Sequence, residues 1–303
     1  MKHRLVLAAF RLGWAVLRWA PEPVGRAVFA VIADAAWWRH GRGVRQLESN
    51  LRRVVGDLGE PSLRRLSRAG MRSYFRYWYE LFRLPVMGSH ELSQRSTVLH
   101  WDTLDEVRAS GRGAILALPH MGNWDQAGAW LVGHGVPFTT VAERLEPAEL
   151  FDRFVDFRES LGMEVLPLTG GAGSPYPLLR ERLRAGGVIC LLADRDLTEN
   201  GVPVEFFGEE ARMPAGPAAL AVATGAALLP VTLTFPSRWR WELRIHAEVP
   251  PPSEGRRSDK VAAMTQQLAD VFAEGIAAAP QDWHMLQRLW VADFAARQVE
   301  VAA

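Results

Sequence analysis

From about residue 100 onward, short apolar runs alternate with segments whose apolar residues recur at helical spacing. The predicted strands are GAILALPH, PFTTVAE, MEVLPLTGG, GVICLLAD, ALLPVTLTF and RWELRIHAEV. The predicted helices between them are NWDQAGAWLVGHG, PAELFDRFVDFRESLG, SPYPLLRERLRAGG and MPAGPAALAVATG. Such alternation predicts an α/β fold, with a mostly parallel central sheet flanked by helices on both faces.

The length and composition fit one large catalytic body with a helical appendage. The chain has 303 residues, of which 49% are hydrophobic and 23% charged, and this excludes the disordered and fibrous classes. We expect residues 87–303 to form one continuous α/β domain and residues 1–86 to form a basic helical segment before it. A single cysteine, Cys190, lies in an apolar run, which excludes a disulfide framework and predicts a buried thiol in a reducing, cytosol-facing location.

Charge is distributed unevenly along the chain. Residues 1–86 hold 16 Lys and Arg against 6 Asp and Glu, whereas the remainder holds 19 against 28. A basic segment joined to an acidic body indicates contact with a polyanion, either nucleic acid or an anionic lipid surface. No zinc-ligand spacing, RNA-binding aromatic strand or helix-turn-helix pattern supports nucleic acid, so we predict none as a partner.

The first 45 residues are typical of helices that lie on a membrane surface. Residues 1–20, read as a helix, carry three arginines on one stripe and apolar side chains on another. A second predicted helix, residues 24–45, pairs Trp37 and Trp38 with further arginines. Neither run stays uncharged for the roughly 18 residues of a membrane span, and neither reads as a cleaved signal peptide. The pattern predicts interfacial helices on an anionic membrane, with simple packing on the domain body as the alternative.

Two strand ends carry the candidate chemistry. LPHMGNWD places His120 at the end of one predicted strand and Asp125 in the first turn of the next helix, while GVICLLAD ends in Asp194. Sites of parallel sheets form at the carboxyl ends of strands. A carboxylate bonded to one ring nitrogen of His120 would leave the other nitrogen to take a proton from a hydroxyl. The helix dipole alone would also explain Asp125, so which acid orients the imidazole stays open.

Other chemistries lack their motifs. The chain has no GxSxG elbow, no Walker lysine motif and no paired Cys/His spacing, so neither a serine hydrolase nor a metal site is expected. One alternative is a dinucleotide-binding unit in VLPLTGGAGSPYPLLRERL, although its glycines read GGAG and Pro175 removes a backbone donor. A non-catalytic lipid-binding protein is a second alternative, but it gives His120 and Asp194 no use.

Four ordered stretches carry a family resemblance: LALPHMGNWD, FRESLG, LLADRDL and VEFFGEEARMPAGPAALAVATGAALLPV. Together they resemble the bacterial lysophospholipid and lipid A acyltransferase superfamily with its His-x4-Asp motif, and within it the actinobacterial phosphatidylinositol mannoside acyltransferases. The resemblance covers about residues 10–290 and implies a glycerolipid acyltransferase-like fold. It also implies transfer of a long acyl chain, such as palmitoyl, from acyl-CoA to a mannose hydroxyl at the cytoplasmic face of the plasma membrane. No cofactor, metal or covalent acyl-enzyme is implied, and a lipid A type enzyme using acyl carrier protein is the alternative.

The resemblance also assigns residues. His120 matches the family's catalytic base, Asp125 the acid of the motif, and Asp194 an acid placed to orient the histidine. Arg158 matches an arginine that faces the site, where it would hold a phosphate or polarise the carbonyl; an exposed helix arginine is the alternative. The weaker substrate-binding predictions are Asn123, Arg195, Asn200 and Arg212. In the C-terminal part, residues 256–279 form a predicted amphipathic helix, and the tryptophans of the following PQDWHMLQRLW are predicted core residues.

Overall fold

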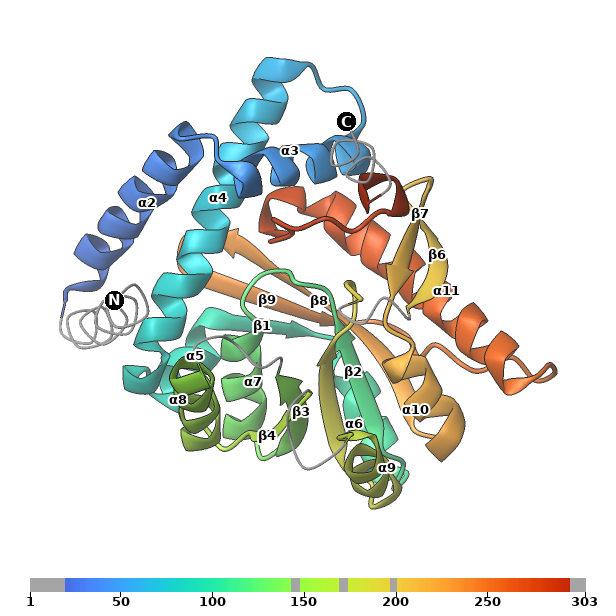
Figure 1. Ribbon diagram of the computed structural model, residues 1–303. Helices are drawn as coiled ribbons and strands as arrows, with labels where there is room; N and C mark the ends of the chain where they lie inside the picture. Colours follow the sequence, from blue (N-terminus) through green and yellow to red (C-terminus); the bar gives the residue numbers. More distant parts are fainter. Residues whose placement is uncertain (1–19, 143–147, 169–173, 197–200, 295–303) are drawn as a thin grey trace.

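The computed structural model describes residues 20–142, 148–168, 174–196 and 201–294. Figure 1 shows their arrangement. The helices are α2 (Glu22–Trp38), α3 (Arg42–Val55), α4 (Glu60–Arg83), α5 (Ser89–Arg95), α6 (Trp101–Ala109), α7 (Trp124–Gly133), α8 (Ala148–Ser160), α9 (Tyr176–Arg184), α10 (Gly216–Thr224) and α11 (Arg257–Ala278), with 3₁₀ turns at Leu84–Val86 and Pro280–Asp282. The strands are β1 (Ser96–Leu99), β2 (Ala114–Leu118), β3 (Phe138–Ala142), β4 (Glu164–Pro167), β5 (Val188–Leu192), β6 (Val202–Phe206), β7 (Glu209–Met213), β8 (Ala227–Ser237) and β9 (Arg240–Ile245).

Seven strands form the central sheet, in the order β1-β9-β8-β2-β5-β3-β4. The pairs β8/β2, β2/β5, β5/β3 and β3/β4 are parallel, and only β8/β9 is antiparallel within this sheet. The predicted mostly parallel α/β fold is therefore confirmed, and all six predicted strands are present. Strand β1, which was not predicted, runs parallel to β9 at the sheet edge.

Helices cover both faces of this sheet, and the side chains of β2 show how. Ile115 and Ala117 pack into a core with α9, α10 and α11. Leu116 and Leu118 face the opposite core, which includes α6, α7 and α8. A strand buried on both faces reads as a continuous apolar run because it has no solvated side. The same alternation brings the end of β2 directly against α7.

The connection from β2 to α7, residues 119–123, carries His120, the predicted base, and is for that reason called the catalytic loop below. Gly122 has φ +61, and a Cβ there would lie 2.7 Å from Cβ and the carbonyl oxygen of Leu233, so only glycine fits without displacing β8. Asn123 then caps α7, because its Oδ1 accepts a hydrogen bond of 3.0 Å from the backbone N–H of Gln126. The two residues turn the chain sharply from strand into helix.

A β-hairpin lies between the predicted strand GVICLLAD and the predicted helix MPAGPAALAVATG, where no strand was predicted. Strands β6 and β7 pair antiparallel, and a turn at Phe207 and Gly208 with positive φ at both positions joins them. This is the geometry of a type I′ turn, whose twist matches that of the flanking strands. The buried residues alternate with exposed ones along both strands: Val204, Phe206, Ala211 and Met213 are buried. Period-two alternation in VPVEFFGEEARM was the signal that could have predicted this hairpin.

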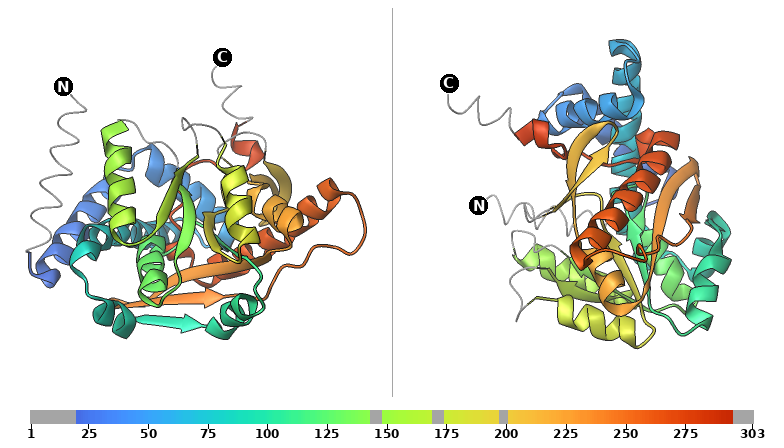
Figure 2. Two further views of the ribbon diagram at one scale, coloured as in Figure 1. Left: turned by 90° about the horizontal axis from the view of Figure 1, so that it is seen from below. Right: turned by 90° about the vertical axis from the view of Figure 1, so that its right-hand side faces the viewer.

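The N-terminal helices pack onto the body. The second predicted helix is two helices, because the chain breaks between α2 and α3 at His40, which has φ +48. Helix α3 buries its apolar face against α4, and α3 with the first turns of α4 projects at one end of the molecule (Figure 1 and Figure 2). The C-terminal half of α4 runs against the catalytic body. The arginine stripe predicted at Arg4, Arg11 and Arg18 lies outside the described residues.

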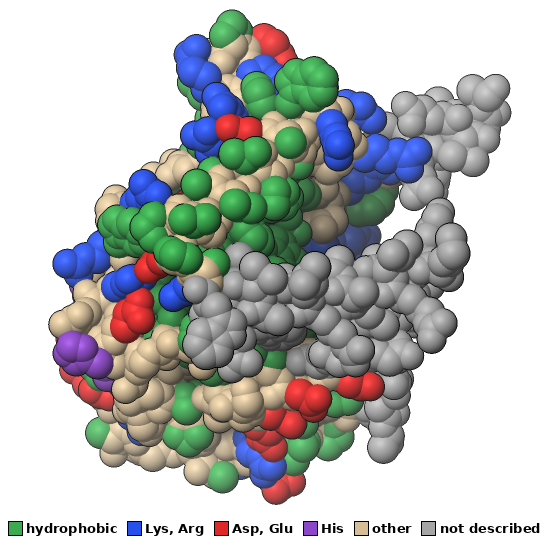
Figure 3. Space-filling model, turned by 90° about the vertical axis from the view of Figure 1, so that its left-hand side faces the viewer, with side chains coloured by type: hydrophobic (Ala, Val, Ile, Leu, Met, Phe, Trp, Pro, Cys, Tyr) green, Lys and Arg blue, Asp and Glu red, His purple; other side chains and the backbone are tan. Residues whose placement is uncertain are grey.

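Helix α2 presents an apolar stripe to solvent. Five large apolar side chains lie along it at helical spacing: Val24, Val28, Val31, Ile32 and Trp38. Val31 is 68% exposed and Trp38 is 78% exposed. Figure 3 shows apolar side chains gathered on this side of the molecule with basic side chains around them. Within the described ranges, no helix is both long and apolar enough to cross a membrane.

Candidate active site

The catalytic loop meets the end of β5 at the pair His120 and Asp194. Each residue stands two positions after its strand, and the last residues of those neighbouring strands, Leu118 and Leu192, are in register. Nδ1 of His120 lies 2.6 Å from Oδ1 of Asp194, and the backbone N–H of His120 donates to Oδ2 at 2.9 Å. The carboxylate is fully buried and accepts a third bond, of 2.9 Å, from the indole Nε1–H of Trp283.

The surroundings of Asp194 favour its ionised form, and this determines which nitrogen of His120 carries the proton. Burial alone would raise the pKa of Asp194, but the charge of His120 and the donors around the carboxylate lower that pKa below its ordinary value. An ionised Asp194 requires a proton on Nδ1 of His120, so Nε2 carries the lone pair. The His120 side chain is 27% exposed, and its Nε2 has no hydrogen-bond partner among the residues that the structure describes. This nitrogen can therefore accept a proton from a bound hydroxyl group.

Asp125, the second residue of the motif, does not bond the imidazole. It is buried, and its carboxylate accepts Nε–H of Arg158 at 2.6 Å and the hydroxyl of Tyr77 at 2.8 Å. A further bond of 3.2 Å from Nη2 makes the arginine contact bidentate. The structure thus resolves the question that the sequence left open: Asp194 orients His120, and Asp125 belongs to a buried ion pair.

Arg158 lies in the interior of the protein, since its side chain is only 18% exposed. The alternative of an exposed helix arginine is therefore wrong. Burial lowers the pKa of the guanidinium, but the charge of Asp125 outweighs this, and the pKa is raised overall. The cation is held in place by the motif's own acid. A contact between Arg158 and substrate stays a prediction.

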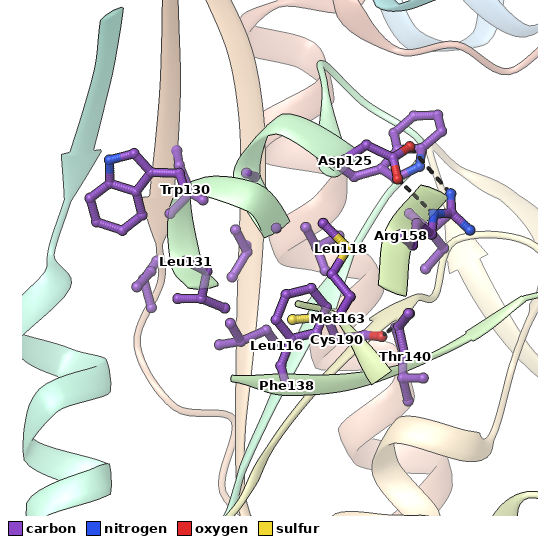
Figure 4. Close-up of a pocket in the computed structure, with 18 of the residues that line it drawn as sticks. Leu116, Leu118, Asp125, Trp130, Leu131, Phe138, Thr140, Arg158, Met163 and Cys190 are labelled. Atoms are coloured by element: carbon purple, nitrogen blue, oxygen red, sulfur yellow. Dashed lines mark hydrogen bonds and ion pairs between the residues drawn. The ribbon is translucent and has the colours of Figure 1, made fainter. Parts of the chain in front are cut away.

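An apolar pocket opens beside this ion pair (Figure 4). It lies between α7 and the sheet, with Asp125 and Arg158 at one end and Trp130 at the other. Its walls include Trp101, Leu116, Leu118, Trp124, Gly128, Leu131, Phe138, Thr140, Met163, Cys190, Val231 and Leu243. The Trp124 ring, whose centroid is 5.7 Å from that of the His120 ring, connects the pocket to the histidine. The predicted buried thiol is found only in part: Cys190 lies in the pocket wall and is half-buried, although its apolar surroundings raise its pKa well above the ordinary value.

A histidine bonded to a buried acid, with an apolar pocket beside it, suits a reaction between a hydroxyl and a lipid-like chain. Residues 3–292 match the sequence model of the bacterial lipid A biosynthesis acyltransferases. The chain belongs to this family. It is also 50% identical to the phosphatidylinositol mannoside acyltransferase of Mycolicibacterium smegmatis over 284 residues, covering 94% of this chain and 91% of the relative. The protein of the same name from Mycobacterium tuberculosis H37Rv is 50% identical over 287 residues, covering 94% and 88%.

The other predicted substrate-binding residues of this acyltransferase are Asn123, Arg195, Asn200 and Arg212. Asn123 is 3% exposed, caps α7 through Oδ1 and donates from Nδ2 to Glu80 at 3.1 Å. Both ends of its amide are engaged within the protein, which gives Asn123 a structural role; a substrate contact for it stays a prediction. Arg212 is on β7, where Nη1 donates to the carbonyl of Gly201 at 3.5 Å. Arg195 directly follows Asp194, and Asn200 lies outside the described residues, as do residues 170–173 of the dinucleotide alternative.

Two parts of the acyltransferase supply site residues that the sequence analysis did not single out. Helix α4 contributes Tyr77 to the Asp125 ion pair and Ser73, whose hydroxyl donates to Asp282 at 2.8 Å. The segment after α11 contributes Trp283, which was predicted to be a core residue, and His284. Local patterns could not reveal these contacts, because each joins elements far apart in the sequence. In the described parts of the chain, no three His, Cys, Asp or Glu side chains are grouped closely enough to hold a metal ion.

Proposed function

We propose that this acyltransferase moves a long acyl chain, such as palmitoyl, from acyl-CoA to a mannose hydroxyl of a phosphatidylinositol mannoside. The names of relatives that share half of its residues over nearly the whole chain support a phosphatidylinositol mannoside as the acceptor. The observation that carries the chemistry is the Nε2 of His120, which has no partner in the described ranges and lies opposite an Nδ1 that is bonded to the buried Asp194. This arrangement is that of a general base whose tautomer is set by a carboxylate.

The proposed reaction needs no covalent enzyme intermediate. Nε2 of His120 takes the proton of the sugar hydroxyl as that oxygen attacks the thioester carbonyl carbon, and Asp194 stabilises the imidazolium that forms. The tetrahedral intermediate then collapses, the carbon–sulfur bond breaks, and the thiolate leaves with the proton from Nε2. The products are the ester and free CoA. A positioned base of this kind contributes roughly a hundred- to ten-thousand-fold to the rate.

The apolar pocket supports the choice of an acyl donor. Its walls are mostly aliphatic and aromatic, and the charged groups lie at the end next to Trp124 and His120. A chain bound along α7 toward Trp130 would leave its carboxyl end beside the histidine. An apolar chain gains free energy in such a site in proportion to the surface that it removes from water. Asp125 and Arg158 neutralise each other there, so the pocket wall carries no unpaired charge from this pair.

We further propose that the enzyme works at the cytoplasmic face of the plasma membrane as a peripheral protein. The exposed stripe of α2 supports this, because Val31 and Trp38 would bury their surface in the interface. Arg39, Arg42 and Arg45 are exposed just after the stripe and suit anionic headgroups. In a vesicle sedimentation assay, Val28→Glu/Val31→Glu should weaken binding of the full chain to anionic vesicles. Ala109→Glu, at an exposed position on α6, is the matched control and should bind as the wild type does.

The substrate proposal is tested by offering alternatives side by side. Purified enzyme is incubated with radiolabelled palmitoyl-CoA or palmitoyl-acyl carrier protein, and with a phosphatidylinositol mannoside, phosphatidylinositol or a lipid A precursor as acceptor. We expect labelled product only with the CoA donor and the mannoside. Transfer from the carrier protein to the lipid A precursor would replace the proposed substrates but keep the chemistry. No transfer with any pair would contradict the proposed function.

A further inference from the structure

Three consecutive residues after α11 attach to the catalytic loop. The backbone N–H of Gly122 donates to the carbonyl of Asp282 at 2.9 Å, and that of His284 donates to the carbonyl of His120 at 2.8 Å. Met121 and Trp283, between these bonds, form an antiparallel bridge. The segment 282–284 therefore runs beside the catalytic loop like a short extra strand.

The segment is itself anchored on two sides. The carboxylate of Asp282 accepts the Ser73 hydroxyl of α4 at 2.8 Å and the backbone N–H of Phe235 in β8 at 2.8 Å. The imidazole Nε2 of His284 lies 2.9 Å from the same serine oxygen. Both side chains are buried, so these bonds are shielded from water and hold the segment in one position. These bonds also fix the position of the Trp283 side chain, which lies between Asp282 and His284 in the segment.

The Trp283 side chain contacts the carboxylate of Asp194, which orients His120. Trp283 is completely buried, and its Nε1–H donates to Oδ2 of Asp194, the oxygen that also accepts the backbone N–H of His120. We propose that Trp283 is a positioning residue for the reaction, which holds the Asp194 carboxylate in the rotamer that bonds Nδ1 of His120. This inference rests on the proposed role of His120 as the base.

The chemistry of the indole suits this task. Indole is a donor only and carries no charge, so it fixes the carboxylate without forming an ion pair with it. An arginine or lysine at this place would pair with Asp194 and compete with the imidazolium that forms during the reaction. The indole ring is also held rigidly, with its centroid 6.1 Å from the Trp290 ring and 6.2 Å from the Phe206 ring, both edge to face. A rigid neutral donor leaves the negative charge of Asp194 available to His120.

Trp290 provides a matched control. It is also fully buried, and its indole N–H donates a hydrogen bond of 2.9 Å to the backbone carbonyl of Phe206. Trp283→Phe and Trp290→Phe each remove one buried indole N–H, but only the first removes it from Asp194. The carboxylate that loses a donor becomes more basic and stabilises a protonated His120 more strongly. The pKa of His120 should therefore rise in Trp283→Phe alone.

The test is an NMR titration of His120 in full-length protein labelled with ¹³C-histidine, with the His120 signal assigned from the spectrum of His120→Asn. We expect the midpoint to rise by about half a unit to one unit in Trp283→Phe and to stay at the wild-type value in Trp290→Phe. The acid limb of kcat/KM for acyl transfer should move by the same amount. Equal midpoints in all three proteins would overturn the proposal and leave Trp283 a core residue.

A second measurement needs no folded variant at position 283. In wild-type protein labelled with ¹⁵N-tryptophan, the indole N–H signal of Trp283 should change with pH at the midpoint of His120, whereas that of Trp290 should not. An indole signal for Trp283 that ignores the His120 titration would also overturn the proposal. The titrations do not require turnover, so a wild-type protein that shows the coupling but transfers no acyl chain would contradict only the proposed function.

Discussion

His120 and Asp194 are 74 residues apart in the chain, yet the carboxylate receives both the ring Nδ1–H and the backbone N–H of the histidine. Two bonds to the same residue fix the position of the loop as well as the orientation of the ring. The catalytic loop thus cannot shift along β5 without breaking the contact that sets the tautomer. This double attachment makes Asp194 the first residue whose substitution should separate activity from folding.

Replacing Asp194 with Asn should lower kcat by about 10³- to 10⁴-fold. The amide presents its NH₂ group to Nδ1, which favours the tautomer with the proton on Nε2, and a protonated Nε2 cannot act as base. Asp194→Glu keeps the charge, and a displacement of about 1 Å should cost no more than about a hundredfold. Initial rates of acyl transfer check both values, and equal activity of Asp194→Asn and wild type would refute the orienting role.

Removing only one partner of the Asp125–Arg158 ion pair should destabilise the protein strongly. Asp125→Ala leaves the Arg158 guanidinium largely buried and uncompensated, which costs about 3–5 kcal/mol of unfolding free energy. The double variant Asp125→Ala/Arg158→Ala removes both charges and should be more stable than Asp125→Ala alone. Urea denaturation of the wild type, two single variants and double variant measures the coupling energy. Additive losses would show that the pair contributes nothing specific.

A methyl group added at Gly128 should change the preference for acyl chain length. A Cβ at this position would lie 2.8 Å from Cε of Met163 and 2.9 Å from Cζ of Phe138, which both line the pocket. Gly128→Ala should lower kcat/KM for palmitoyl-CoA relative to octanoyl-CoA by about tenfold, because one methylene of room is worth about 1–3 kcal/mol. Gly133→Ala, on the same helix with only Ser89 within 4 Å, is the control and should leave the ratio unchanged. An unchanged ratio in Gly128→Ala would place the acyl chain elsewhere.

Acid should destabilise the fold through His284. Burial lowers the pKa of this imidazole to about 3, whereas the unfolded chain titrates near its ordinary value of about 6.5. Between these values only the unfolded chain binds the proton, so unfolding free energy falls as pH decreases below about 6.5. His284 should account for about 1.4 kcal/mol of the loss between pH 7.5 and 5.5.

The measurement is urea denaturation at both pH values for wild type, His284→Gln and the exposed-site control His90→Gln. The loss of unfolding free energy between the two pH values should be smaller by this amount in His284→Gln and unchanged in His90→Gln. The same pH dependence in all three proteins would mean that His284 carries a proton in the fold.

The fold was largely predictable because its central strands are buried on both faces. Runs such as AILAL in β2 and VICLL in β5 have no polar positions, and glycines and helical periodicity separate them clearly. The hairpin β6/β7 was not predicted because charged residues on the outer faces of its strands, among them Glu205 and Glu210, interrupt the apolar runs that mark the other strands. Strand β1 has only four residues, and its pairing with β9 depends on contacts more than 140 residues away in the chain.

Only the residues of the candidate site that follow directly after strands could be placed from the sequence. His120 and Asp194 meet because parallel neighbours end at the same edge of the sheet, which the strand pattern implies. The partner of Arg158 and the role of Trp283 could not be predicted, since those contacts arise from helix packing and from a segment docked across the loop. Asn123 lies within the motif and was predicted as a substrate contact, and in the structure it caps helix α7.

The role of His120 is tested most directly by the rate of acyl transfer from radiolabelled palmitoyl-CoA to a phosphatidylinositol mannoside, measured for wild type and His120→Ala, with the fold of both checked by circular dichroism. We expect His120→Ala to fold like the wild type and to lose about a hundred- to ten-thousand-fold in kcat. A folded His120→Ala variant with wild-type kcat would contradict the assignment of His120 as the base.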